Sequence, residues 1–380
     1  MKASRNRTIF IVDSDPVVGE QVKALADEYG IPTRRFSTVS ETLEALRKQD
    51  AAALLLGSSE EDLVSQVIRV RDEKEMSLLP LLAVVREPRS ETLRKAFDHW
   101  LDDFLVLGSL DHLRGKLAVL VESDEWKAMR APVGLAVVGV EDRQDRILWA
   151  RILQRHGYDI HFASTPDEVE KAFVRMQDYR MFLVSQDLLT QNLCDELRRS
   201  GDEKGKIQPS WIFLTSEERT PAADLGAIRD VPGIALFETK QPAENITHVI
   251  NKLMAPPQSE ARKSPRLYFA EPVRFMIEGD SNWYWTFSWN LNRQGLFLRT
   301  LTPPPQSTRL TLEFTPPFGE GMVHLDAQVV WRKEFGSKRT VLSPTGMGVL
   351  FTRIPLADTA ALEAGYQKLL SLSGEQVAVS

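Results

Sequence analysis

Residues 36–46 read FSTVSETLEAL and residues 163–173 read ASTPDEVEKAF, so similar segments recur at an offset of 127 positions. In both, small polar residues lead into apolar residues at helical spacing. Ser40 and Asp167 lie where we expect the N-caps of the two helices. This pair of segments predicts that the chain contains one fold twice.

The surrounding sequence extends the repeat. Residues 8–122 alternate strand-like apolar runs, such as TIFIV, AALLLG and DDFLVL, with amphipathic helical stretches, and residues 133–254 follow the same plan. The helical stretch before each repeated segment stops at a glycine, Gly30 in one copy and Gly157 in the other. Strands that alternate with helices predict a parallel sheet covered on both faces, so we expect two doubly wound α/β domains.

The pattern changes after residue 254. APPQSEARKSP is rich in proline and polar residues and predicts a linker. Apolar residues then recur with period two in short runs separated by glycine and proline, which predicts a small antiparallel β-barrel. The tail LADTAALEAGYQKLLSLSG has helical spacing and should pack on this barrel. The predicted division is an α/β domain at 1–125, a second at 130–255, a linker with an arginine motif at 256–265, and a barrel with its C-terminal helix at 262–380.

Composition limits the classes of function. The chain has 380 residues and a single cysteine, Cys194, which excludes an internal disulfide framework and a thiolate-rich zinc site. Residues 258–380 hold 13 Lys and Arg against 11 Asp and Glu, whereas residues 1–257 hold 34 against 42. This basic excess is too small for a general nucleic-acid-binding surface and fits a small anion better. The apolar run near the N-terminus is short, so we expect no signal peptide, no membrane insertion and a cytoplasmic protein.

The two α/β repeats resemble the receiver domains of response regulators. FIVDSDPVV at 10–18 and WLDDFLVLGSLDHL at 100–113 carry the resemblance, which implies a flavodoxin-like fold. A working receiver has an acidic pair after its first strand, a phosphoacceptor aspartate after the third, a hydroxyl residue after the fourth and a lysine after the fifth. The corresponding positions hold Asp13, Ser14, Gly57, Val85 and Leu107 in the first copy, and Gly139, Val140, Ser185, Thr215 and Glu238 in the second.

Both copies therefore lack the phosphoacceptor, and the first copy should bind Mg²⁺ poorly through Asp13 alone. Two interpretations remain open. In the one we favour, the degenerate receivers are surfaces that bind partner proteins or form a homodimer. In the other, Asp13 with Asp15, or Asp187, still accepts a phosphoryl group in a displaced geometry.

The barrel resembles a PilZ domain, the bacterial receptor module for cyclic di-GMP, over about residues 260–356. RKSPR at 262–266 matches the family's Arg-x-x-x-Arg motif, and NLNRQG at 290–295 matches its Asp/Asn-x-Ser-x-x-Gly motif. GLFLRT and TGMGVLF further along also look like this family. The resemblance implies that cyclic di-GMP is bound by Arg262, Lys263, Arg266, Asn290, Asn292 and Gly295. Asn292 is a departure, because the family usually has serine at that position.

The chemistry of the ligand agrees with these residue types. Guanine presents O6 and N7 as adjacent acceptors, and an arginine fork meets both with parallel hydrogen bonds or stacks on the purine face. Asn290 and Asn292 would bond the amide and amine edge of the base, since their side chains both donate and accept. Gly295 would let the backbone turn where a Cβ atom would clash.

Three tryptophans form a further pattern. Trp283, Trp285 and Trp289 alternate along NWYWTFSWN and should share one face of a strand, with Tyr284 on the other. We expect one face of this strand to fill the barrel core. The alternative is a partly exposed aromatic strip that serves as a docking surface.

These observations predict a signalling protein that is not an enzyme. We find no P-loop, nucleophile elbow, zinc-ligand spacing or nucleotide-cyclase signature, and we expect no metal and no cofactor. No helix-turn-helix region follows the repeats, which argues against direct DNA binding. The leading hypothesis is a cyclic di-GMP effector whose receiver-like domains bind signalling or motility proteins. The alternative is a ligand-independent scaffold whose barrel has lost messenger binding.

Overall fold

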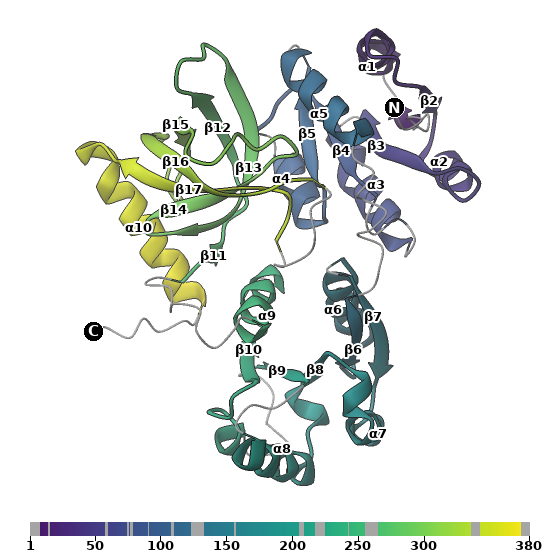
Figure 1. Cartoon of the computed structure of the whole chain (residues 1–380), viewed down its shortest axis with the longest axis vertical. Coiled ribbons are helices and arrows are strands. Elements are labelled where there is room, and N and C mark those ends of the chain that lie inside the picture. Colours follow the sequence, from purple (N-terminus) through teal and green to yellow (C-terminus); the bar gives the residue numbers. More distant parts are fainter. Residues whose placement is uncertain are drawn as a thin grey trace. The chain divides into compact units, whose positions relative to one another are not determined.

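The computed structural model describes residues 8–13, 16–57, 60–73, 76, 79–89, 91–107, 110–122, 133–155, 157–204, 209–216, 225–241, 243–254, 265–335 and 343–373. These residues form two α/β domains and a β-barrel (Figure 1). The first α/β domain and the barrel belong to one compact unit, and the second α/β domain belongs to another. Nearly all of the predicted linker lies outside the described residues.

The first α/β domain contains a five-stranded parallel sheet in the order β2-β1-β3-β4-β5. The strands are β1 (Thr8–Asp13), β2 (Thr33–Phe36), β3 (Ala51–Gly57), β4 (Leu81–Val85) and β5 (Asp103–Val106). The helices are α1 (Pro16–Glu28), α2 (Val39–Leu46), α3 (Glu60–Asp72), α4 (Glu91–Asp98) and α5 (Leu110–Glu122). Every residue of β3 and β4 is buried, because helices cover both faces of the sheet.

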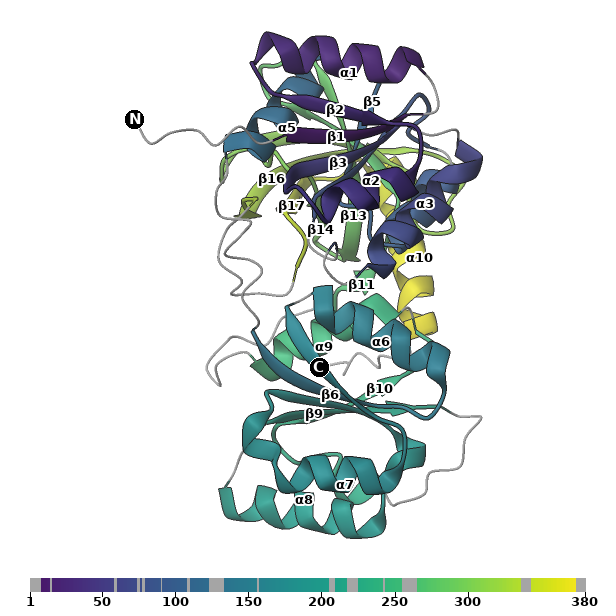
Figure 2. The same cartoon turned by 90° about the vertical axis from the view of Figure 1, so that its right-hand side faces the viewer.

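Each face of this sheet has its own hydrophobic cluster. One cluster joins the sheet to α2, α3 and α4, and the other joins it to α1 and α5. Figure 2 shows α1 on one side of strands β1, β2 and β3, and α2 and α3 on the other. This arrangement is the doubly wound fold that the alternating sequence pattern predicts.

The second α/β domain repeats this topology. Its parallel sheet has the order β7-β6-β8-β9-β10, which is the strand order of the first sheet. The strands are β6 (Gly134–Gly139), β7 (Tyr158–Ala163), β8 (Met181–Ser185), β9 (Ser210–Thr215) and β10 (Ile234–Glu238). The helices are α6 (Arg143–Arg155), α7 (Pro166–Val174), α8 (Gln191–Lys204) and α9 (Ile246–Met254), with 3₁₀ turns at Met176–Asp178, Gln186–Leu188, Leu225–Ala227 and Ala243–Asn245. Cys194 is buried in the cluster beneath α7 and α8.

The repeated segment is stabilised in the same way in both domains, although the predicted N-caps are wrong by two residues. The caps are Thr38 and Thr165, whose hydroxyls accept the backbone N–H groups of Glu41 and Glu168. Each glutamate in turn accepts an N–H from the residue before the cap, so the motif is a capping box of the form Thr-x-x-Glu. Ser40 and Asp167 lie inside the first turn instead.

The third domain is a closed antiparallel barrel with an additional short strand. The barrel runs β13-β12-β15-β16-β17-β14 and closes by pairing of β14 with β13, while β11 pairs with the other edge of β13. The strands are β11 (Leu267–Tyr268), β12 (Pro272–Ile277), β13 (Trp283–Asn292), β14 (Gly295–Arg299), β15 (Arg309–Phe314), β16 (Val323–Lys333) and β17 (Gly346–Arg353). Helix α10 (Leu356–Ser373) contributes Leu362, Tyr366 and Leu370 to the barrel core, as the spacing of the tail predicts.

One face of β13 packs on the barrel core, and it is the face of Tyr284 rather than that of Trp285. Tyr284 packs on the core, whereas Trp285 and its neighbour Phe287 pack on the first α/β domain. The guanidinium of Arg89 lies 5.2 Å from the Trp285 ring centre. Alternation correctly places these aromatic residues on one face, but it does not say which face is inside, because both faces of β13 are covered.

The first α/β domain and the barrel share hydrophobic cores. Phe287 is fully buried and stacks on Phe97 of α4, with ring centres 4.0 Å apart. Leu301, which follows β14, is buried in the cluster of α1 and α5. Because both clusters of the first domain continue into the barrel, the two should unfold together.

None of the described helices combines the length and the apolar character that crossing a membrane requires.

Candidate functional site

Strand pairing brings the two sequence motifs of the barrel together. In the β11–β13 ladder, Leu267 pairs with Leu291 and Tyr268 with Asn290. Arg266 immediately precedes β11. The same register therefore places its backbone beside that of Asn292. Arg266 is half-buried. The structure thus places the second arginine of RKSPR beside the asparagines of NLNRQG, 24 positions later in the chain. Arg262 and Lys263 lie outside the described residues.

The NLNRQG segment forms a tight hairpin between β13 and β14. Asn292 pairs with Gly295, and the Asn292 side-chain oxygen accepts the N–H of Gln294 at 3.0 Å. A Cβ atom on Gly295 would lie 2.0 Å from the backbone oxygen of Val349 on β17. The glycine is therefore required by the close approach of two strands.

Helix α10 holds both motifs from one side. The hydroxyl of Tyr366 donates to the carbonyl of Pro265, the residue before Arg266, at 3.2 Å. One turn earlier, Glu363 accepts a hydrogen bond at 2.8 Å from Arg293, which lies in the hairpin loop. The C-terminal helix thus fixes the position of the arginine segment relative to the hairpin.

Asn290 is the most unusual side chain of the site. It is 2% exposed, and its Nδ2 atom has no hydrogen-bond partner among the described residues. A buried amide without a partner costs about 1–3 kcal/mol. Leu291 beside it points into the barrel core, so Asn290 points to the outer face, where a ligand could supply the missing acceptor.

The acidic site of the first α/β domain is closed by internal contacts. The register of β1 and β3 places Asp13 directly opposite Gly57. The buried Asp13 carboxylate accepts hydrogen bonds at 2.9 Å from the Arg35 guanidinium and from the N–H of Gly19. Arg35 supplies positive charge beside this carboxylate, where a receiver would hold Mg²⁺.

A phosphoacceptor at position 57 would not fit this arrangement. A Cβ atom on Gly57 would lie 2.9 Å from the side chain of Val18 and 3.3 Å from the Asp13 carboxylate. Val85 ends β4 and Leu107 follows β5, so the predicted positions of the hydroxyl residue and the lysine are apolar. Ser14 and Asp15 lie outside the described residues.

The corresponding strand ends of the second α/β domain are also engaged internally. Ser185 donates to Asp187 at 3.2 Å, and Thr215 donates to the carbonyl of Phe237 at 3.3 Å. Glu238 forms an ion pair with Lys240 at 2.6 Å. Gly139 ends β6 and Val140 follows it, at the place of the acidic pair. Among the described residues, no group of three or more His, Cys, Asp or Glu side chains could hold a metal ion.

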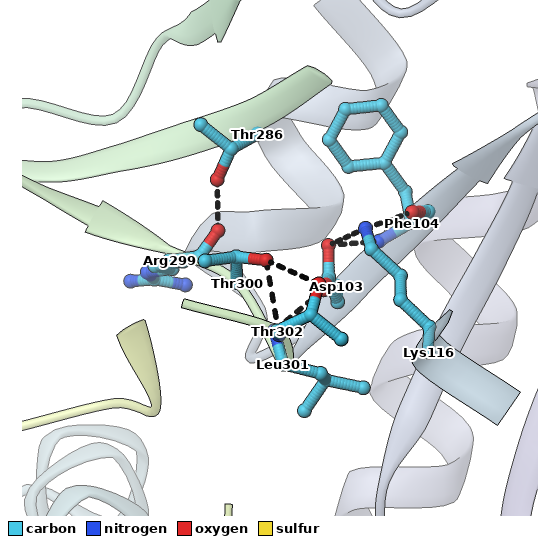
Figure 3. A network of polar contacts seen from close by, with 8 residues as sticks. All are labelled: Asp103, Phe104, Lys116, Thr286, Arg299, Thr300, Leu301 and Thr302. Carbon is cyan, nitrogen blue, oxygen red and sulfur yellow. Dashed lines mark hydrogen bonds and ion pairs between the residues drawn. The ribbon is translucent and has the colours of Figure 1, made fainter. Parts of the chain in front are cut away.

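A buried polar network between the first α/β domain and the barrel was not predicted from the sequence (Figure 3). Lys116 of α5 donates at 2.7 Å to Asp103 and to the carbonyl of Phe104, both on β5. The second carboxylate oxygen of Asp103 accepts the N–H of Leu301 at 2.9 Å. Asp103 and Lys116 are almost fully buried, but neither stands out in the sequence, because Asp102 and Arg114 lie close to them in the chain.

Helix α4 lies next to the ligand motifs in this interface. The Tyr268 hydroxyl donates to Asp98 at 2.6 Å, and the Arg299 guanidinium lies 5.4 Å from the ring centre of Phe97. Burial raises the pKa of the nearby Glu271 carboxyl above its ordinary value; Arg94 opposes this rise, whereas Glu91 and Asp98 add to it. The ligand motifs and the domain contact therefore share the outer face of β11 and β13.

A comparison with known families identifies the C-terminal part of the chain. The family model of the PilZ domain matches residues 260–367. No curated protein matches the chain.

Several solved structures are similar in part. A response regulator from Chloroflexus aurantiacus J-10-fl is 21% identical, with a TM-score of 0.28, over 31% of this chain and 100% of that one. A two-component response regulator/GGDEF domain protein is 17% identical, with a TM-score of 0.33, over 66% of this chain and 100% of that one. The PilZ domain of CeSA from a cellulose-synthesising bacterium is 16% identical, with a TM-score of 0.22, over 28% of this chain and 98% of that one.

The strand order identifies the fold of the two α/β domains that precede the barrel. Both parallel sheets have the flavodoxin-like order 2-1-3-4-5, which receiver domains share. The chain therefore contains two α/β domains with the receiver-like strand order, followed by a barrel that matches the PilZ family model.

Proposed function

We propose that this chain is a non-catalytic bacterial signalling protein whose PilZ domain binds cyclic di-GMP. The observation that carries the proposal is the juxtaposition of Arg266, Asn290 and Asn292 on one outer face of the barrel. Arginine and amide side chains are the groups that read the acceptor edge and the donor edge of guanine.

The roles of these residues follow from their surroundings. Asn290 is buried and presents an amide without a partner among the described residues, so a guanine carbonyl would satisfy it. Asn292 already uses its oxygen in the hairpin turn, so it offers its NH₂ group to the ligand. Arg266, together with Arg262 and Lys263, would contact the guanine O6 and N7 atoms and the phosphates.

The receiver-like domains have a different role in this proposal. Arg35 and Val18 fill the acidic site of the first domain, so it would act without phosphorylation. Its α4 and β5 pack on the barrel, so it would be a fixed part of the messenger receptor rather than a separate binding module. Partner proteins, or a second copy of the chain, would bind at other receiver-like surfaces.

Isothermal titration of the full chain with cyclic di-GMP tests the proposal. We expect binding at micromolar concentration or below, with strong loss in Arg262→Ala and Arg266→Ala. Arg309→Ala is the matched control, because this arginine is 71% exposed on β15, away from both motifs. Cyclic di-AMP should bind much more weakly, because adenine lacks the O6 acceptor.

The absence of any heat with the folded wild-type chain would favour the alternative, a ligand-independent scaffold. In that case, Arg262→Ala would leave cellular function intact, and charge reversals on a receiver-like surface would abolish it.

A further inference from the structure

The outer face of the barrel continues the candidate site as a row of residues in register. The row crosses strands β11, β13, β14, β17 and β16 in that order. Its members, each paired with the next, are Tyr268, Asn290, Phe297, Gly348 and Trp331. Residues directly opposite in antiparallel strands project from the same face. Their neighbours along each strand, Leu267, Leu291, Leu296 and Val349, lie in the barrel core, so the row lies outside.

Three aromatic rings of this face contact one another in sequence. Trp289 and Phe297 have ring centres 5.5 Å apart, and Phe297 and Trp331 have ring centres 5.7 Å apart. Phe297 and Trp331 are separated by β17, or about 10 Å between their backbones. The rings can meet because Gly348, the residue between them on β17, has no side chain.

Only one of these rings is accessible. Trp289 and Phe297 are 4% and 2% exposed, whereas Trp331 is 39% exposed. The buried Phe297 ring therefore packs against one side of the exposed Trp331 indole and restricts its orientation. The adjacent row runs from Asn292 and Gly295 to Leu350, which is also exposed, so an apolar surface adjoins the polar motif.

Building on the proposed function, we propose that Trp331, supported by Phe297, is the surface on which one guanine of cyclic di-GMP stacks. Three strand spacings, about 14 Å, separate Trp331 from Asn290. A ligand with two purines on one sugar–phosphate ring can present the edge of the first to Asn290 and Arg266 and the face of the second to Trp331. The buried Nδ2 atom of Asn290, which has no hydrogen-bond partner among the described residues, and the exposed indole of Trp331 would supply complementary contacts for such a ligand.

The proposal adds Trp331 to a site that the two motifs alone would not include. A base stacked on an aromatic side chain typically accounts for a loss of roughly tenfold to a hundredfold in affinity when the ring is removed. The affinity gained by stacking should depend on the aromatic ring, so a phenylalanine at position 331 should preserve most of that affinity.

Titration of full-length variants with cyclic di-GMP tests this inference. We expect Trp331→Ala to weaken binding at least tenfold and Trp331→Phe to weaken it less than about threefold. Trp283→Ala is the matched control, since it lies seven residues from Asn290 on the same strand, or about 24 Å away. Circular dichroism and thermal unfolding should show that each variant remains folded, because Trp331 is partly exposed.

A blocking substitution gives an independent readout. A Cβ atom on Gly348 would make only ordinary contacts, the nearest at 3.8 Å to Trp331, so Gly348→Leu should fold. Its side chain would push between the two rings and should reduce affinity as much as Trp331→Ala does. In addition, ligand-dependent quenching of tryptophan fluorescence should be lost in Trp331→Phe while binding is retained.

The outcomes separate this inference from the proposed function. If Arg266→Ala abolishes binding but Trp331→Ala and Gly348→Leu bind as the wild type does, the stacking surface is refuted and the messenger site remains. If the wild-type chain does not bind the messenger at all, both proposals fail. Equal losses in Trp283→Ala and Trp331→Ala would also refute a specific role for Trp331.

Discussion

Asp103 of the first receiver-like domain accepts the backbone N–H of Leu301 in the barrel at 2.9 Å, while its other oxygen binds Lys116 at 2.7 Å (Figure 3). The buried Asp103 carboxylate therefore neutralises the Lys116 ammonium in its own domain and accepts a backbone N–H from the barrel. Leu301 is itself buried in the hydrophobic cluster of α1 and α5. The polar and apolar contacts at this point fix the barrel to the first domain.

Asp103→Asn should strongly destabilise this unit. The substitution leaves the Lys116 ammonium buried without a counter-charge, which costs about 3–5 kcal/mol of unfolding free energy. Chemical denaturation measures this loss. Glu73→Gln is the control, because its ion pair with Arg47 is exposed and should change stability by less than about 0.5 kcal/mol. Equal stability of Asp103→Asn and the wild type would contradict the assigned role of the network.

Glu271→Gln should stabilise the protein in a pH-dependent way. Burial raises the pKa of this carboxyl in the folded state, so the charged form is penalised above the raised pKa. The wild type should therefore recover stability as the pH falls through that pKa, whereas the glutamine variant has no such group to titrate. The variant should be more stable at pH 7, and the difference should disappear below the ordinary value of 4.5.

Thermal unfolding of both proteins between pH 4 and pH 8 checks this expectation. Arg94, Glu91 and Asp98 are present in both proteins, so their own titrations largely cancel, whereas their interactions with the Glu271 charge are part of the measured difference. A difference that grows toward low pH would contradict the assignment.

Gly295→Ala should disrupt the hairpin that carries Asn290 and Asn292. The added methyl group would lie 2.0 Å from the backbone oxygen of Val349, and a backbone atom cannot rotate away. We expect a loss of about 3 kcal/mol and weaker messenger binding. Gly321→Ala is a suitable comparison, because a Cβ atom there would meet nothing within 4 Å. The contact is assigned wrongly if the two alanine variants unfold at the same temperature.

Tyr366→Phe should lower messenger affinity more than it lowers stability. The hydroxyl removed by this change holds the carbonyl of Pro265 beside Arg266, and one such hydrogen bond contributes about 1 kcal/mol. Tyr284→Phe removes a hydroxyl that binds Asp280 at the opposite end of β13 and should leave affinity unchanged. Titration calorimetry compares them, and equal affinities would argue against α10 as a clamp on the arginine segment.

Gly57→Asp should not restore phosphorylation to the first receiver-like domain. The new side chain would collide with Val18 and approach the Asp13 carboxylate, which Arg35 already neutralises. Incubation with acetyl phosphate and Mg²⁺ should leave both the wild type and the variant unmodified in intact-mass measurements. A phosphoryl group on either protein would support the displaced-geometry interpretation instead.

The local elements can be predicted from the sequence, because each depends on neighbouring residues. The 127-residue repeat, the glycines that end α1 and α6, and the period-two strands of the barrel are all found in the structure. Gly30 and Gly157 have φ values of +63° and +88°, a conformation in which glycine ends a helix without strain. The loss of the phosphoacceptor and the hairpin at Gly295 could also be read from residue type and position.

The faces that meet depend on packing between distant segments. Alternation placed Trp285 on one side of β13 and Tyr284 on the other, but hydrophobicity cannot distinguish a barrel core from a buried domain contact, because both exclude water. The Asp103–Lys116 pair and the row from Asn290 to Trp331 join residues far apart in the chain, and only strand pairing and domain packing bring them together. The charges and spacing of residues predict the local structure of each segment. Which other segments it contacts depends on strand register and side-chain packing.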